Sequence, residues 1–220
     1  DLFRYGSDAS CVTGTNAPGG LLCGISYWDG ATTSVFYDTS GRISRIITHG
    51  TEQYDFQWNG SNNLVFVRDP LANDAIAAGV RANDAAAKTM IEYGSGPTGS
   101  AAPIAITGPA GTAGGPRTRH SYTYNAGETI EQICAGVGAC ATYAGFAPTS
   151  GFYRRTRYDG AGRIYEETNA AGLTTATTWT AKNQVASTNG PDGLRTTRFY
   201  DAAGRLTDTW GPAAAAAFNP

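Results

Sequence analysis

The amino-acid sequence predicts an all-β fold built of stacked β-hairpins, and three observations support this prediction. The 220-residue chain has 29 Gly and 10 Pro, which are weak helix formers. It also has 12 Tyr and 4 Trp, which favour strands, but only one Met. A seven-residue motif recurs along the chain, and its leading aromatic residues are 21 positions apart in three places. A fixed period of this length indicates a repeat protein.

The motif occurs in three strong copies and three weaker ones. The strong copies read Tyr-Asp-x-x-Gly-Arg-Ile/Leu and begin at Tyr37, Tyr158 and Tyr200. The weaker copies keep the register with a different residue at some positions. The predicted repeat framework consists of Tyr37, Asp38, Gly41, Arg42, Trp58, Tyr124, Tyr158, Asp159, Gly162, Arg163, Trp179, Tyr200, Asp201, Gly204 and Arg205.

The residue types in the motif predict a tight turn between two strands. An Asp side chain at the head of the turn can accept a hydrogen bond from the backbone two residues later. Glycine at its end can take a positive φ without a Cβ clash. One strand should therefore end at the aromatic residue and the next begin near the Arg. A second turn, near Gly172 and Gly193, leads to the next hairpin. One such unit is too small to be stable alone, so the units are expected to stack side by side.

The motif and its period resemble the YD repeat of bacterial RHS proteins, Tc-toxin shell subunits and teneurins. The resemblance covers Val35 to about Pro70 and about Arg117 to Pro212, roughly 130 residues. It implies an open, spiralling sheet or partial barrel, and a role in enclosing a cargo, in surface adhesion or in binding carbohydrate. The chain departs from the family in two ways: its six repeats are fewer than a full shell contains, and the self-cleaving RHS core segment is not recognisable.

Breaks in the period divide the chain into five segments. Residues 71–116 are interpreted as an insertion, in which Asp84 is expected to cap a short helix through Ala85–Glu92. Gly94 to Pro116 is expected to be a loop with a short strand at Ile104–Thr107. The predicted segments are an irregular N-terminal segment at 1–34, repeats at 35–70, the insertion at 71–116, repeats at 117–212 with a Cys-containing loop at 131–152, and a tail at 213–220.

Four cysteines fall into two sequence-local pairs, Cys11 with Cys23 and Cys134 with Cys140. An even number in close pairs favours two disulfides formed in an oxidising compartment, although three connectivities are formally possible. We therefore expect an extracellular or cell-surface protein. Four buried thiols are the alternative. Zinc is disfavoured, because neither pair has the usual ligand spacing.

No catalytic residue, cofactor or metal site is predicted. The formal net charge is −2 and basic runs are short, so we expect no nucleic-acid partner. The sequence contains no stretch of 18 apolar residues, so we expect no membrane-spanning segment. The segment Gly94–Gly99 matches G-x-G-x-x-G, but a dinucleotide site needs a strand before it and a helix after it. Two other groups are alternatives for catalysis: a triad that includes one of the two histidines, His49 or His120, and a glycosidase pair among Glu52, Asp55, Glu128, Glu131, Glu166 and Glu167.

The sequence therefore predicts a non-enzymatic, extracellular YD-repeat structural module that serves as a shell or surface scaffold. Its expected partners are further YD repeats of the same or neighbouring chains. Three alternatives stay open: a subunit of a self-assembling surface filament, a carbohydrate-binding adhesin that uses aromatic residues outside the core, and an enzyme whose site lies in the insertion loops.

Overall fold

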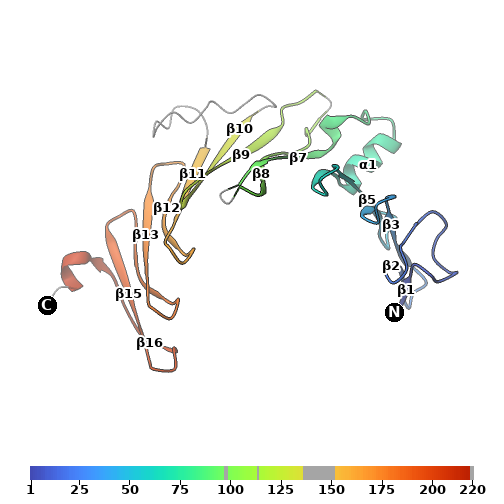
Figure 1. Ribbon diagram of the computed structural model, residues 1–220. Helices are drawn as coiled ribbons and strands as arrows, with labels where there is room; N and C mark the ends of the chain where they lie inside the picture. The colour runs from blue at the N-terminus through green and yellow to red at the C-terminus, as the bar shows by residue number, and fades with distance from the viewer. Residues whose placement is uncertain (97–98, 113, 136–151, 219–220) are drawn as a thin grey trace. The chain divides into compact units, whose positions relative to one another are not determined.

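β-Strands dominate the computed structural model, which describes residues 1–96, 99–112, 114–135 and 152–218 (Figure 1). Within these residues, 16 strands lie in one sheet in the order in which they occur in the sequence. Strands β1 and β16 are its two edges, so the sheet is open and is not closed into a barrel. The predicted all-β fold of successive hairpins is therefore confirmed. No helix in the described part of the chain is long and apolar enough to cross a membrane.

The chain forms two compact units, which we describe separately. The first contains most of residues 1–94 and 105–118, and the second contains 95–104, 119–134 and the described residues after 151. The strands of the early part are β1 (Leu2–Tyr5), β2 (Leu22–Ser26), β3 (Thr32–Tyr37), β4 (Ile43–Ile47), β5 (Gln53–Trp58), β6 (Leu64–Arg68), β7 (Thr89–Ser95) and β8 (Ala101–Thr107). Those of the later part are β9 (Thr118–Asn125), β10 (Glu128–Ala135), β11 (Phe152–Tyr158), β12 (Ile164–Thr168), β13 (Thr174–Trp179), β14 (Val185–Asn189), β15 (Leu194–Tyr200) and β16 (Leu206–Ala214).

The α-helix within the insertion lies earlier than the sequence predicted. Helix α1 spans Pro70–Ala77, and Asp69 caps it by accepting a hydrogen bond from the backbone N–H of Ala72 at 2.8 Å. Pro70 suits the first helical position because its missing N–H would have no partner there. The expected helix at Ala85–Glu92 is wrong in its extent. Asp84 caps only one 3₁₀ turn, Ala85–Ala87.

Strand formation explains why the helix does not continue past this turn. The residues from Thr89 to Tyr93 include β-branched and aromatic side chains, and they form most of β7. Strand β7 pairs antiparallel with β6, with Phe66 facing Met90 and Val67 facing Thr89. The expected long loop after Gly94 is also corrected, since β7 extends to Ser95 and β8 begins at Ala101. Of the G-x-G-x-x-G segment the structure describes Gly94–Gly96 and Gly99. The N–H of Gly96 donates to the carbonyl oxygen of Ser100 at 2.7 Å, and the N–H of Gly99 donates to the carbonyl oxygen of Gly96 at 3.0 Å.

Two arginines hold the insertion of the first unit to its surroundings. The guanidinium of Arg117 donates to the carbonyl oxygens of Gly108 at 2.7 Å and Lys88 at 2.8 Å, and this side chain is buried. Burial lowers the pKa of Arg117. Arg81 donates to the carbonyl oxygens of Ala86 and Ala110. Backbone carbonyls outside the strands thus accept hydrogen bonds from cationic donors, which form strong hydrogen bonds.

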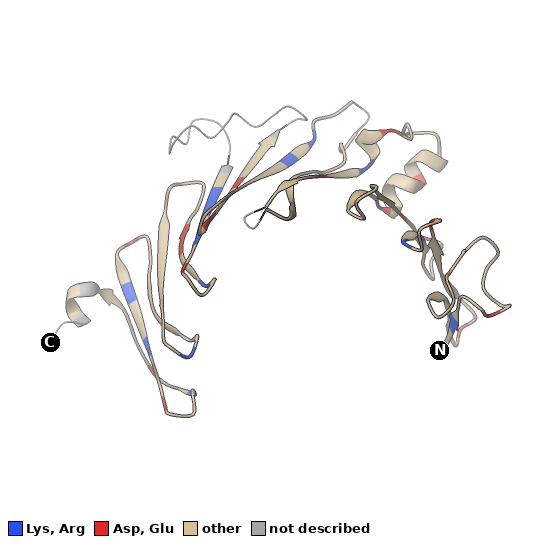
Figure 2. Ribbon diagram, in the orientation of Figure 1, with Lys and Arg blue, Asp and Glu red and all other residues tan. Residues whose placement is uncertain are grey.

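Few of the side chains that the structure describes are fully buried, because each hairpin contributes only short strands. In the first unit Cys23, Val35 and Tyr37 are buried at β2 and β3, and in the second Ile130 is buried on β10. Ion pairs across neighbouring strands supplement this packing. Figure 2 colours the ribbon positions of the charged residues. The carboxylate of Asp55 on β5 binds Arg45 on β4 and Arg68 on β6, both at 2.8 Å.

Candidate functional site: the junction between consecutive hairpins

The turn of each strong repeat has the hydrogen bonds that the sequence predicts. In the first, the N–H of Gly41 donates to the carbonyl of Asp38, and the Oδ1 of Asp38 accepts from the N–H groups of Ser40 at 2.9 Å and Arg42 at 3.0 Å. Gly41 has a φ of 74°. This left-handed conformation is unfavourable for residues with a Cβ, so glycine suits the position. The strand before the turn ends at Tyr37, and the next begins at Ile43.

The weaker copies at Trp58 and Trp179 build the same turn from other residues. Asn59 takes the place of the aspartate, and its Oδ1 accepts from the N–H of Ser61 at 2.9 Å and of Asn63 at 3.0 Å. In the other copy the hydroxyl of Thr180 accepts from two N–H groups at 3.2 Å. Asn62 and Asn183 replace the glycine, each with a φ of 61°. Asparagine tolerates this region better than most residues.

The repeat arginine connects its own turn to the turn of the next hairpin. The Nε of Arg163 donates to the carboxylate of Asp159 at 2.8 Å. Its Nη1 donates to the carbonyl oxygen of Thr180 at 3.1 Å and to the Oδ1 of Asn183 at 2.9 Å. Arg42 makes the equivalent three bonds to Asp38, Asn59 and Asn62. The arginine is therefore a link between repeats as well as a partner of its own aspartate.

The aromatic residue makes a bond in the opposite direction, to the preceding hairpin. The indole Nε1–H of Trp58 donates to the carbonyl oxygen of Ile43 at 2.7 Å, and that of Trp179 donates to Ile164 at 2.8 Å. The hydroxyls of Tyr37 and Tyr200 donate to the carbonyls of Leu22 and Val185 at 2.8 and 2.9 Å. In all four cases the acceptor lies 15 residues earlier and is the first residue of a return strand.

A cation–π contact closes two of these junctions. The guanidinium carbon of Arg42 lies 6.0 Å from the ring centroid of Trp58, and that of Arg163 lies 5.8 Å from the ring of Trp179. Such contacts add about 0.5–1 kcal/mol at exposed sites. One side chain from each hairpin thus contacts the backbone of the other, and the two side chains also contact each other.

The ion pairs within the turns shift the titration of the aspartates. A hydrogen bond from the side chain of Arg42 holds the pKa of Asp38 below its ordinary value, and Arg163 does the same for Asp159. For Asp201, the backbone N–H of Arg205 is the main cause of the lowered pKa, followed by the side chain. These carboxylates are ionised at neutral pH and occupied as acceptors.

Not every framework residue enters this arrangement. In the copy at Tyr124, β9 continues to Asn125 and β10 begins at Glu128, so the turn is shorter; the Tyr124 hydroxyl donates to Pro103, 21 residues earlier. Tyr158 donates its backbone N–H to the carbonyl of Gly127 at 2.8 Å. Arg205 binds Asp201 at 2.7 Å, but its side chain is 82% exposed, compared with 23% for Arg42 and 26% for Arg163.

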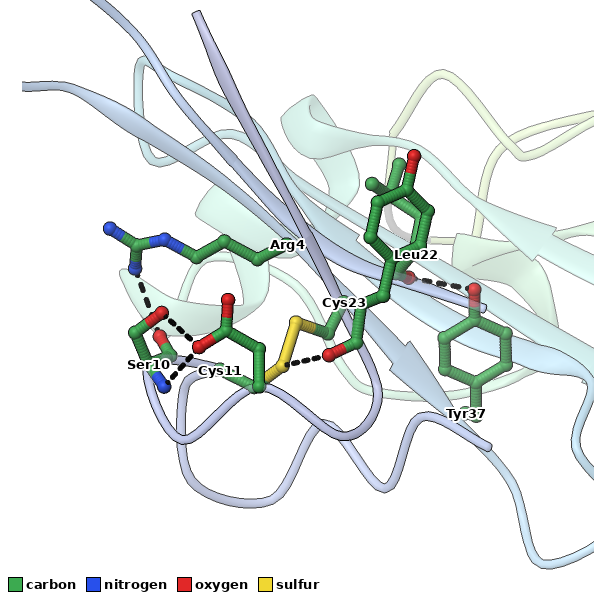
Figure 3. The surroundings of a disulfide bond; sticks show 8 residues. Arg4, Ser10, Cys11, Leu22, Cys23 and Tyr37 are labelled. Atoms are coloured by element: carbon green, nitrogen blue, oxygen red, sulfur yellow. Dashed lines mark hydrogen bonds between the residues drawn. A yellow bond between two sulfur atoms is a disulfide. The ribbon is translucent and has the colours of Figure 1, made fainter. Parts of the chain in front are cut away.

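The N-terminal hairpin is fixed by a disulfide between Cys11 and Cys23, which confirms the first predicted pair (Figure 3). Cys23 lies on β2 beside Leu22, whose carbonyl accepts from the Tyr37 hydroxyl. The cross-link therefore holds the 16-residue connection between β1 and β2 next to the first junction. Cys140, and with it the predicted pairing with Cys134, lies outside the described residues.

The carboxylates weighed as a catalytic pair mostly bind cations. Asp55 binds Arg45 and Arg68, and Glu167 binds Arg154. On β10 to β12, Arg157 binds both Glu128 and Glu166 at 3.0 Å, and the second of these also binds Arg155 at 2.9 Å. Glu52 accepts from the Thr48 hydroxyl at 3.1 Å.

Both histidines also lie beside carboxylates. The Nε2 of His49 lies 2.7 Å from the Oδ2 of Asp29, and the Nδ1 of His120 lies 2.9 Å from the Oε1 of Glu131. The described part of the chain contains no group of three or more His, Cys, Asp or Glu side chains placed to hold a metal ion.

Sequence reasoning missed the partners of the framework side chains. The carbonyl acceptors at Leu22, Ile43, Ile164 and Val185 have no side-chain signature, since any residue supplies a carbonyl. Gln184 was also missed: it occupies the arginine position of its repeat, and its Nε2 donates to the carbonyl of Gly204 at 2.5 Å. Its place five residues after Trp179 was the available signal.

The fold and the repeated junction define a protein of stacked β-hairpin repeats. No protein-family profile matches the chain, and no curated protein matches it. Among solved structures it is similar to the TcdB2–TccC3 assembly, with 14% identity and a TM-score of 0.46 over 88% of this chain and 11% of that one.

A second similar structure is the Photorhabdus luminescens Tc holotoxin pore with a variant TccC3, with 12% identity and a TM-score of 0.44 over 86% of this chain and 10% of that one. The chain thus spans about a tenth of the length of these neighbours. Membership of the YD-repeat family stays a prediction of the sequence motif.

Proposed function

We propose that this chain is a non-enzymatic structural module of the YD-repeat type, which acts outside the cell as part of a shell or surface scaffold. The observation that carries the proposal is the junction itself. Two links occur at both junctions: the arginine bonds to the next turn, and the aromatic residue bonds to the previous return strand. They join the hairpin of Arg42 to that of Trp58, and the hairpin of Arg163 to that of Trp179. A geometry that repeats along a sheet extends a surface, and that is what a scaffold requires.

The chemistry of the repeated residues supports a structural role over a catalytic one. Asp38 and Asp159 accept hydrogen bonds from two backbone N–H groups and one arginine each. A general acid or base needs a pKa near the working pH. The pKa values of these aspartates are lowered, away from neutrality.

The proposed location outside the cell rests on the disulfide. Cys11 and Cys23 are joined across 12 positions. Disulfides persist in oxidising compartments and are rare in the reducing cytosol. The first test is therefore protease treatment of intact and permeabilised cells of the source organism that carry the tagged full chain. Cleavage on intact cells, or release into the medium, supports the proposal. Protection until permeabilisation, with both thiols free, would refute the external location.

A second test addresses the absence of catalysis. The purified chain is incubated with a panel of chromogenic glycosides and compared with a Glu166→Gln variant. We expect no turnover above background in either protein. Turnover that Glu166→Gln abolishes would overturn the non-enzymatic assignment. The paired design separates a true activity from a contaminating hydrolase, which the substitution would leave unchanged.

One observation favours carbohydrate binding as a second candidate function. Trp28, in the turn between β2 and β3, is 91% exposed. Beside it, Asp29 bonds to His49 at 2.7 Å, and the His49 ring contacts Tyr27 edge-on with the centroids 5.5 Å apart. An exposed indole offers an apolar face, and the neighbouring carboxylate and imidazole offer polar groups. A glycan array with the native chain and Trp28→Ala tests this: binding lost in the variant supports the adhesin, and no binding by the native chain refutes it.

A further inference from the structure

A small cavity lies over β5 and β6 in the first unit. Its volume is about 220 Å³, below the roughly 300–1,000 Å³ of pockets for drug-sized ligands, so it suits a smaller molecule. The strand register places four of its lining side chains on one face of the sheet, since Asp55 faces Arg68 and Gln57 faces Phe66. Lys88 lines the cavity from the connection before β7, and its Nζ lies 5.3 Å from the centroid of the Phe66 ring.

The ion pair in the wall of this cavity is already satisfied. The carboxylate of Asp55 accepts from Arg68 at 2.8 Å. It also accepts from Arg45 at 2.8 Å and from Gln53 at 3.1 Å. The Nη1 of Arg68 donates to the Oδ1 of Asn83. The guanidinium of Arg68 is therefore not free to bind an anion in the two-pronged way typical of arginine. Two guanidinium groups around one carboxylate nevertheless leave this wall with a net positive charge.

Lys88 and Gln57 supply the donors that the chain leaves unused. Lys88 is half-buried, and its ammonium makes no ion pair or hydrogen bond within the described residues; its contact is with the Phe66 ring. The exposed amide of Gln57 is likewise without a hydrogen-bond partner in that part of the chain. The backbone of Lys88 is held in place, because its carbonyl accepts from the buried Arg117 at 2.8 Å. An ammonium that has lost part of its water and has no counter-charge gains from binding an anion.

We propose that this cavity binds a small organic carboxylate. The ammonium of Lys88 would pair with the carboxylate, and the amide of Gln57 would donate to its second oxygen. The Phe66 ring would contact the carbon skeleton of the ligand. An apolar ring beside two single donors suits an organic acid, whereas phosphate and sulfate are better matched by a free arginine fork. The site goes beyond the scaffold role and does not depend on it.

A titration of the ¹⁵N-labelled full chain, followed by two-dimensional NMR, tests the proposal. The probes are propionate and benzoate, each compared with its neutral amide, and then sulfate and inorganic phosphate. We expect saturable shifts of the backbone amide signals of Phe66 and Lys88 with the two carboxylates, and none with the neutral amides. Equal shifts with the amides, or no saturable shift with any probe, would overturn the site. Tighter binding of sulfate or phosphate than of either carboxylate would overturn the class of ligand.

Two variants and a matched control assign the binding to the named donors. Lys88→Gln should weaken carboxylate binding about tenfold or more, as loss of a hydrogen bond to a charged group does. Gln57→Met keeps the size of the side chain and should weaken binding about fivefold. The control is Lys182→Gln, which removes the other lysine of the chain; that lysine donates to the carbonyl of Ala202 in the second unit. It should leave the affinity unchanged.

Far-UV circular dichroism checks that each variant is folded. If Lys88→Gln does not fold, Gln57→Met carries the test, because its side chain is exposed and bonded to nothing in the described residues. Affinities equal to that of the native chain in the folded cavity variants, or a loss that Lys182→Gln shares, would overturn the assignment of the site to this cavity.

Discussion

The indole Nε1–H of Trp179 donates to the backbone carbonyl of Ile164, 15 residues earlier and in the preceding hairpin, at 2.8 Å. The side chain that marks the repeat in the sequence is therefore a hydrogen-bond donor between repeats as well as a packing group. Tyrosine performs the same task in other copies, because both residues combine an apolar ring with a polar donor. This shared chemistry explains why either Tyr or Trp can occupy the position.

Trp179→Phe should lower the free energy of unfolding by about 1 kcal/mol or somewhat more, since the carbonyl of Ile164 loses its donor. The same substitution at the exposed Trp28 is the control and should change stability by less than about 0.5 kcal/mol. Urea unfolding followed by far-UV circular dichroism measures both. Equal effects at the two sites would show that the junction bond adds nothing.

Arg163→Ala should be more destabilising than Arg205→Ala, although both residues bind their own aspartate. Only Arg163 also donates to the next turn, at Thr180 and Asn183. We expect a loss of about 1–3 kcal/mol for Arg163→Ala and well under about 1 kcal/mol for Arg205→Ala. Thermal unfolding of the two variants at a low protein concentration provides the comparison. The reverse order would contradict the linking role of the arginine.

Gly162→Ala should cost about 1 kcal/mol, because Gly162 has a φ of 75° and alanine disfavours the left-handed region. Nothing lies within 4 Å of a Cβ built there, so the cost would be conformational and not steric. Gly160→Ala, in the same turn, is the matched control: it is equally open and has no positive φ. A denaturant titration that ranks the two variants equally would contradict this account of the turn.

Acid should destabilise the first unit partly through Asp55. Burial raises its pKa, but bonds from Arg45, Gln53 and Arg68 outweigh burial and lower it to about 2. A lowered pKa in the folded state stabilises above the ordinary value near pH 4, and this stabilisation is lost as the pH falls towards 2. The shift corresponds to about 2 kcal/mol.

The Asp55→Asn variant isolates this contribution. The difference in unfolding free energy between the native chain and the variant should be largest above pH 4 and should shrink as the pH approaches 2. Urea titrations at several pH values between 2 and 7 measure it. A difference that is constant over this range would show that the ionisation of Asp55 does not contribute.

Much of the local structure could be predicted because it depends on residue types close in sequence. Asp159 and Gly162 predict their turn, since a side-chain acceptor and a residue that takes positive φ act within four positions. The helix was misplaced because two Asp residues, at positions 69 and 84, both cap a turn. The pairing of Thr89 and Met90 with β6 decides which Asp begins the α-helix, because it places the residues after the second cap in a strand. This pairing is a contact between segments distant in sequence.

The sequence by itself determined the hairpins of the strong repeats and the residues that mark their turns, because these follow from local conformational preferences and a period of 21. Only the tertiary structure decided what those residues bind. The partner of Trp179 is a backbone carbonyl, which every residue has, and the partners of Arg163 lie 17 and 20 positions later. Such partners are chosen by strand register, and register is fixed only when the hairpins stack.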